Sequence, residues 1–70
     1  MQALSNAKAG ESYTIKWMLG LTEVLDFLHS RHVKEGTTVR VIQRCRESVI
    51  IEVQDVRLAL GGEIADRIKV

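Results

Sequence analysis

Two neighbouring stretches with the same apolar period constrain the fold of this chain more than any other feature. Apolar residues occupy every second position of residues 48–53 and again of residues 56–60, but on opposite parity. A period of two is typical of a strand with one face in a core. The parity changes at Gln54-Asp55, and Asp tolerates the positive φ that a two-residue hairpin turn requires. We therefore predict an antiparallel hairpin whose inner face carries Val49, Ile51, Val53, Val56, Leu58 and Leu60.

A strand and a helix are predicted before this hairpin. Residues 13–18 alternate, so that one face of the strand takes Tyr13, Ile15 and Trp17. Thr22 is placed to cap a helix of about ten residues, because Glu23 then falls in the first turn, where acidic residues suit the helix dipole. The helix is expected to end near Arg31-His32. It must pack its apolar stripe on the sheet through Val24, Leu25, Phe27 and Leu28.

The remaining predicted elements are two strands and one helical turn. Residues 37–44 and 68–70 are predicted strands, and residues 63–67 form a helical turn after Gly61-Gly62. Ile42 breaks the alternation of its strand, which favours a bend at that point. Five short strands are too many for one flat sheet at this size, and closure removes exposed edges. We predict a mostly β fold, a small β-barrel of about five strands, SH3-like or OB-like, with one helix and a C-terminal helical turn.

Length and composition limit the chemistry that the chain can perform. A domain of 70 residues buries only about 60% of its unfolded surface, so a deep catalytic cavity would use up its thin core. The single Cys excludes a disulfide framework, and no nucleophile–base pair or phosphate-binding glycine loop is present. We therefore expect no enzyme. We treat residues 1–70 as one domain, with residues 1–3 expected to fray.

The sequence also argues against direct contact with membranes or nucleic acids. No stretch approaches the about 18 apolar residues of a membrane span, and the start lacks a signal-peptide pattern, so we expect a cytoplasmic protein. The net charge is only +1. Aromatic residues are few and are predicted in the core, so no stacking platform accompanies the arginines and we expect no nucleic-acid partner. The arginines that share an outward sheet face are expected to be Arg40, Arg44, Arg46 and Arg57.

One group of side chains has metal-ligand residue types. Asp26 and His29 are spaced i, i+3 on the outward face of the predicted helix, and His32 follows at its end. Two or three of these ligands could gather on one cation. Histidines on helix surfaces are mostly solvated, so we expect no resident cofactor and at most weak binding of ferrous iron or zinc. Cys45 has no base placed beside it, and a catalytic thiol is not expected.

The connection Met18-Leu19-Gly20-Leu21 is unusually apolar for a loop. Exposed apolar residues often mark an interface with another molecule. The competing interpretation is that Leu19 and Leu21 fasten the helix onto the sheet and belong to the core. The sequence leaves both interpretations open.

Three spaced sets of residues and an opening segment together cover nearly the whole chain. Their patterns are Leu-x4-Val-x2-Gly-x2-Val-x-Val from Leu28, Ile-x-Val-x3-Arg-Leu-Ala-Leu from Ile51, and Ala-x2-Ile-x-Val from Ala65. In this order and spacing they resemble the ferrous iron transport protein A (FeoA) family. The opening segment that is similar to that family consists of Leu4, Ala7, Gly10 and Glu11.

The resemblance implies an SH3-like barrel and a role beside the ferrous iron permease, a large membrane protein with a cytosolic nucleotide-binding domain. We expect contact with the cytosolic portion of the permease, and so only indirect association with the membrane. The alternative is an SH3-like regulatory domain of a metal-dependent transcriptional repressor, and neither interpretation predicts an oligomeric state. The residues expected at the permease contact are Met18, Leu19 and Leu21, with Arg40 and Arg44 as an electrostatic rim.

The chain departs from the family pattern in three places. Arg31-His32 stands where many members have Leu-Gly. If that glycine has a positive φ, His32 must adopt a backbone state that is unfavourable for a residue with a side chain. The short segment 45–48 replaces a longer loop, and Gly61-Gly62 stands where a basic residue is usual. Contacts through those two loops therefore do not follow from the resemblance.

Overall fold

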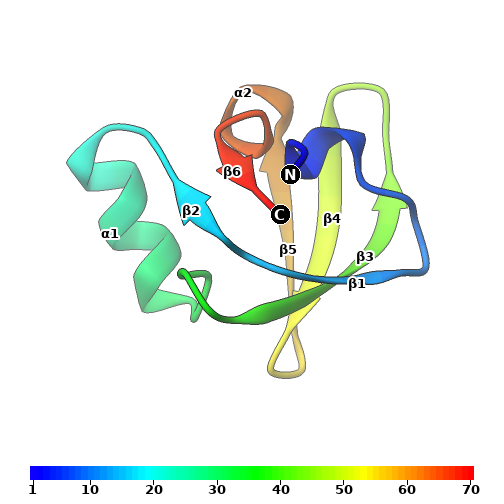
Figure 1. Ribbon diagram of the computed structural model, residues 1–70, viewed down its shortest axis with the longest axis horizontal. Helices are drawn as coiled ribbons and strands as arrows, with labels where there is room; N and C mark the ends of the chain where they lie inside the picture. Colours follow the sequence, from blue (N-terminus) through cyan, green and yellow to red (C-terminus); the bar gives the residue numbers. More distant parts are fainter.

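The computed structural model describes all 70 residues, arranged as two antiparallel sheets with one longer helix set to one side (Figure 1). One sheet has four strands in the order β1-β3-β4-β5, and the other pairs β2 with β6. A short 3-10 helix, η1, precedes the strands. The elements are η1 (Leu4–Asn6), β1 (Ser12–Thr14), β2 (Trp17–Met18), α1 (Thr22–Ser30), β3 (Thr38–Arg44), β4 (Ser48–Val53), β5 (Val56–Gly61), α2 (Gly62–Ala65) and β6 (Ile68–Lys69).

The predicted hairpin is confirmed as β4 and β5. Val53 pairs with Val56, so only Gln54 and Asp55 form the turn. Both turn residues have positive φ, 49° and 66°. This geometry matches the right-handed twist of the strands it joins, which is why the parity of the apolar residues changes across the turn.

The predicted strand 13–18 is wrong as a single element, because the chain changes partners in its middle. The Ile15 N–H donates to the carbonyl oxygen of Thr37 at 2.9 Å, beside β3, whereas the Lys16 N–H donates to that of Lys69 at 2.7 Å, in β6. The first half is therefore β1 and the second half is β2. This switch also corrects the closed barrel: four strands form one sheet, and β2 leaves it to pair with β6.

The bend predicted at Ile42 is confirmed. The pairing of β3 with β4 shifts register between Val41 and Gln43, so Ile42 is the extra residue of a β-bulge. A bulge increases the local twist and turns the strand. It explains why Val41 is buried while Ile42 is only half-buried, although both are apolar.

One apolar core joins the two sheets and η1. The inner positions of β4 are all buried, as the alternation predicts, and Leu58 of β5 packs against them half-buried. Val56, at the tip of the hairpin, is exposed instead. Tyr13 and Trp17 are half-buried, and Met18 lies inside although Trp17 was the residue predicted to face inward. The buried residues are Leu4, Ala7, Ile15, Met18, Leu28, Val33, Val39, Val41, Val49, Ile51, Val53, Leu60, Ala65, Ile68 and Val70.

The N-terminal cap of helix α1 lies one residue earlier than predicted. The Leu25 N–H donates to the carbonyl oxygen of Leu21 at 2.9 Å, so Leu21 is the capping position and Thr22 is already helical. No side chain caps this end. Helix ends are defined by backbone bonds, and a sequence pattern places them only to within one or two residues.

The predicted end of α1 is confirmed. His32 has the positive φ that is expected if it stands where many family members have glycine. The His32 N–H donates to the carbonyl oxygen of His29 at 3.0 Å, and the Val33 N–H to that of Leu28 at 2.9 Å. These two bonds form a Schellman motif, which requires a left-handed residue after the helix. His32 fills this position with φ 66°, where glycine is usual.

The two ends of the chain lie side by side (Figure 1). Gln2, in the segment expected to fray, exchanges two backbone hydrogen bonds with Val70, at 2.9 and 2.8 Å. Both bonds extend the β2–β6 sheet, since Ala3 also bridges to Lys69. None of the helices has the length and apolar character needed to cross a lipid bilayer.

Candidate functional site

Helix α1 is the least buried element with an apolar stripe. Of its nine residues only Leu28 is buried, while Val24 and Leu25 are half-buried. Phe27, predicted to face the sheet, is instead 49% exposed. The helix packs through Leu28 at the centre of its stripe, so Phe27 falls at the edge of that contact. Figure 1 shows α1 standing beside the sheets instead of lying across them.

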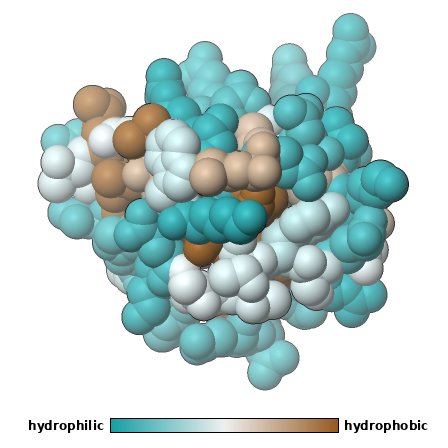
Figure 2. Space-filling view, viewed as in Figure 1, coloured by the Kyte–Doolittle hydropathy of each residue, from teal (hydrophilic) through white to brown (hydrophobic).

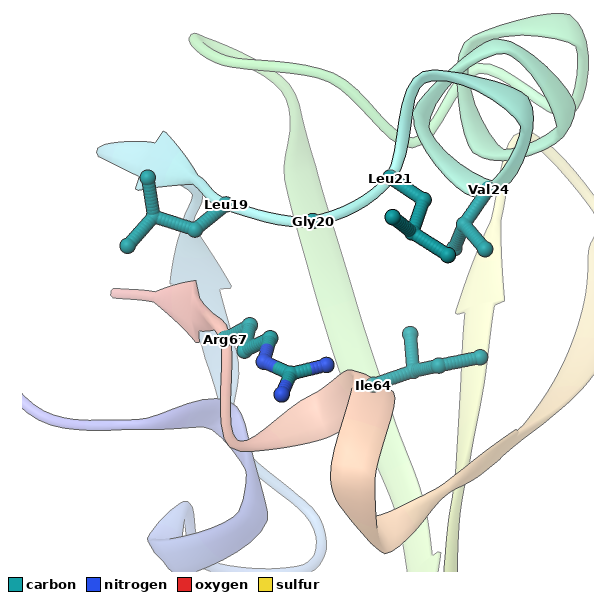
Figure 3. A pocket seen from close by; sticks show the side chains of 6 residues that line it. All are labelled: Leu19, Gly20, Leu21, Val24, Ile64 and Arg67. Carbon is teal, nitrogen blue, oxygen red and sulfur yellow. The ribbon is translucent and has the colours of Figure 1, made fainter.

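The one pocket of the structure lies between α1 and α2. It is small, with a volume of about 50 Å³, and it is open to the solvent. Leu21 and Val24 reach it from the start of α1, whereas Ile64 reaches it from α2, and the Arg67 guanidinium lies across the same gap (Figure 3). Most of the lining is apolar: Leu19, Gly20, Leu21, Val24, Ile64 and Arg67.

Backbone geometry around Gly20 shapes this pocket. The Leu19 N–H donates to the carbonyl oxygen of Arg67 at 2.9 Å, which fixes the loop beside the α2–β6 connection. Gly20 then has φ 151°, a value that residues with a side chain rarely adopt. A Cβ built there would lie 3.9 Å from Leu25 Cδ2, so space is available and only the backbone state requires glycine. Figure 3 shows that Leu19 and Leu21 consequently point in different directions.

The three apolar residues predicted for partner contact are placed differently by the structure. Met18 lies in the core at 9% exposure and is not available to a partner. Leu19 and Leu21 are 55% and 69% exposed, so they do not fasten the helix onto the sheet. Two large exposed aliphatic residues, separated only by Gly20, form a patch of the kind that interfaces use. Figure 2 shows this patch as brown atoms at the left of the view, over the segment that leads into α1.

The predicted electrostatic rim does not lie at this pocket. Arg40 and Arg44 belong to β3, which pairs with β1 and β4, and neither lines the pocket. The cation that does line it is Arg67. Sequence reasoning missed Arg67 and Ile64, because a single helical turn has no periodicity that would mark either residue as facing Leu21.

On the outward face of the sheet, arginines alternate with a glutamate across neighbouring strands. The strand register places Arg40 beside Glu52, and Glu52 beside Arg57, in one row across β3, β4 and β5. Arg57 Nε lies 3.7 Å from Glu52 Oε2, the one ion pair of the structure. A row of alternating charge lacks the single-sign surface that nucleic-acid binding uses.

The predicted metal ligands do not converge. No three His, Cys, Asp or Glu side chains lie close enough together to hold a metal ion. Asp26 and His29 are exposed on α1, and His32 follows the helix in its left-handed backbone state. Cys45 is a free, exposed thiol in the turn between β3 and β4. The apolar pocket is therefore the strongest candidate site.

Comparison with protein families and solved structures identifies relatives along the whole chain. The sequence model of the FeoA domain matches residues 2–70. The crystal structure of an iron uptake regulatory protein (FeoA) is 28% identical, with a TM-score of 0.84 over 94% of this chain and 89% of that one. No curated protein matches the chain.

Metal-dependent repressors share the fold. A manganese-dependent transcriptional repressor is 17% identical, with a TM-score of 0.85 over 96% of this chain and 39% of that one. ScaR with bound Cd²⁺ is 21% identical, with a TM-score of 0.85 over 97% of this chain and 33% of that one. The chain thus corresponds to between a third and two fifths of each repressor, and at these identities the likeness shows the fold alone.

Proposed function

Because the chain belongs to the FeoA domain family, whose role is in ferrous iron transport, we propose that it is a non-enzymatic accessory protein of ferrous iron uptake. It acts in the cytoplasm through contact with the cytosolic portion of the ferrous iron permease. Iron is the cargo of the permease in this proposal, and this chain needs no resident metal. Its association with the membrane is indirect, through the permease.

The observation that carries this proposal is the exposed apolar patch at Leu19 and Leu21. A small domain with one thin core gains stability by burying such side chains, so leaving two leucines in water costs about 1.5–3 kcal/mol for each one that could have been buried. Both leucines instead border a pocket beside a helix that has little packing of its own. This arrangement supports a binding surface and offers no groups for bond chemistry.

The test is an amide NMR titration of the labelled protein with the cytosolic portion of the permease. We expect shifts that cluster on residues 19–24 and on Ile64 and Arg67. Leu19→Ser and Leu21→Ser should each weaken binding at least about ten-fold, since apolar anchors at an interface carry 1–2 kcal/mol or more.

Val56→Ser is the matched control for these variants. Val56 is also an exposed aliphatic residue, at 42%, but it lies at the tip of the β4–β5 hairpin and not at the pocket. It should bind like the parent protein. Titration with ferrous iron alone, under anaerobic conditions, is the second arm. The permease portion could cause no shifts, while iron alone shifts the amides of Asp26, His29 and His32. That result would contradict docking and indicate that the protein carries metal.

The second candidate is a regulatory domain of a metal-dependent repressor, which the shared fold favours. It predicts that the reading frame extends upstream into a helix-turn-helix segment, since the repressors that share this fold are about three times as long as their matched part. Sequencing the surrounding gene checks this directly. If the reading frame lacks such a segment, the repressor interpretation is excluded and the accessory function is retained.

A further inference from the structure

Three apolar residues form a ridge along α1, beginning at the capping residue that precedes the helix. Leu21, Val24 and Phe27 are spaced i, i+3 and i+6, so they lie next to one another along the helix surface. Leu21 and Phe27 are exposed and Val24 is half-buried, so the ridge faces outward. Its first two residues also line the pocket. We call this set of three residues the α1 ridge.

A guanidinium group stands at each end of the α1 ridge. Arg67 lies across the pocket at the Leu21 end. Arg31 lies over the ring of Phe27 at the other end, with its Cζ 5.3 Å from the ring centroid. Neither arginine has a carboxylate within ion-pair distance, because the single ion pair of the protein joins Arg57 to Glu52. Both cations are therefore free to meet an acidic group from outside.

This charge pattern argues against a second copy of the chain as the occupant. Two copies that packed their ridges together antiparallel would bring the Arg31 end of one against the Arg67 end of the other. Like charges that meet at an interface cost free energy and suppress that pairing. The acidic residues of α1, Glu23 and Asp26, are exposed, and neither forms an ion pair with Arg31 or Arg67. A partner with apolar side chains and carboxylates matches the surface better.

We propose that the α1 ridge and the pocket bind an amphipathic helix of the permease's cytosolic portion, whose apolar stripe lies on the ridge and whose acidic side chain pairs with Arg67. This inference rests on the proposed function and names the chemistry of its partner. Helix ridges pack naturally against a second helix, and an apolar face read at i, i+3 and i+4 is a common mode of recognition. The ridge and its flanking Arg31 together span about 15 Å at 1.5 Å per residue, so a partner helix of about three turns covers both.

Charge reversal at Arg67 tests the inference in the same titration. Arg67→Glu should weaken binding of the permease's cytosolic portion at least about ten-fold, and Arg67→Gln by less, because like charge repels where neutrality only loses attraction. Arg44→Glu is the matched control. It makes the same charge change on an exposed arginine away from the pocket and should shift the dissociation constant less than about two-fold.

Salt dependence and a compensating charge change in the partner complete the test. Raising the salt concentration should weaken binding of the parent protein more than that of Arg67→Gln, since only the parent makes the proposed ion pair. Circular dichroism melts of all variants show whether each remains folded. An acidic residue of the permease helix, changed to Lys, should restore the binding of Arg67→Glu.

The outcomes separate this inference from the proposed function. If the parent protein does not bind the permease portion, the proposed function fails. If it binds, and Leu21→Ser weakens binding while Arg67→Glu does not, the proposed function stands. The proposed pairing of an acidic side chain with Arg67 is then wrong. An effect of Arg44→Glu equal to that of Arg67→Glu would place the electrostatic contact on the sheet. Dimers in sedimentation that Leu21→Ser abolishes would show that a second copy covers the ridge.

Discussion

The β3–β4–β5 sheet and helix α1 use apolar residues in opposite ways. Every inward residue of β4 is buried, and its strand is paired on both sides. Helix α1 buries only Leu28 and leaves Phe27 exposed, with Leu21 exposed at its start. Stability is therefore concentrated in the sheet, whereas the surface available for binding is concentrated at α1. The difference teaches that apolar side chains at α1 can change to suit a partner with little effect on folding.

The largest expected effect comes from the same truncation made in the two regions. Ile51→Ala should lower the free energy of unfolding by about 2–5 kcal/mol, because Ile51 is fully buried. For a chain of 70 residues this is a large part of a total of about 4–10 kcal/mol. Leu21→Ala should change it by less than about 0.5 kcal/mol. Urea denaturation measures both changes. Equal losses of stability would contradict the conclusion that stability is concentrated in the sheet.

Hydrogen exchange compares the two regions without any mutation. Amides in β4 should exchange only by opening of the whole domain, whereas those of α1 should exchange by local opening. We expect protection at Leu25 and Leu28 to be at least about ten-fold lower than at Ile51, a difference of about 1.4 kcal/mol. Exchange followed by NMR resolves individual amides. Protection as high in α1 as in β4 would show that the helix is not a separate unit.

The left-handed residue after α1 gives a smaller effect. His32→Gly should stabilise the protein by up to about 1 kcal/mol, because glycine adopts φ 66° without the cost of about 1–2 kcal/mol that a side chain adds. Part of that gain is offset by the freedom of glycine in the unfolded chain. His32→Val should destabilise instead, since branching at Cβ disfavours this backbone state. Thermal melts compare the two variants, and a loss of stability with Gly would contradict the proposed strain.

The smallest expected effect concerns the exposed end of α1. Arg31→Gln removes the cation over the Phe27 ring and should lower stability by about 0.5 kcal/mol, the range for exposed cation–π pairs. Arg31→Lys keeps the charge and should lose less. Denaturation of the two variants side by side gives the comparison. If both leave stability unchanged, the contact of Arg31 with the Phe27 ring contributes nothing measurable to folding.

Local patterns in the sequence predicted most elements of the sheet. The period of two in β3, β4 and β5 needs no knowledge of distant residues, because a strand exposes its faces alternately whatever it pairs with. The turn at Gln54 and Asp55, the bend at Ile42 and the end of α1 are likewise encoded within a few residues. The apolar character of Leu19 and Leu21 was visible too, but not whether they are exposed.

The arrangement of the site depended on contacts between distant parts of the chain. The partner change between Ile15 and Lys16 requires that β6 lies beside β2, and it turns Met18 inward and splits a strand that the alternation had joined. The same packing brings Arg67 to the loop before α1. The sequence by itself determined which segments form strands and which residues are apolar, because these are local properties. Only the tertiary structure decided which apolar side chains remain in water and which cation stands beside them, because both depend on the packing of elements far apart in the chain.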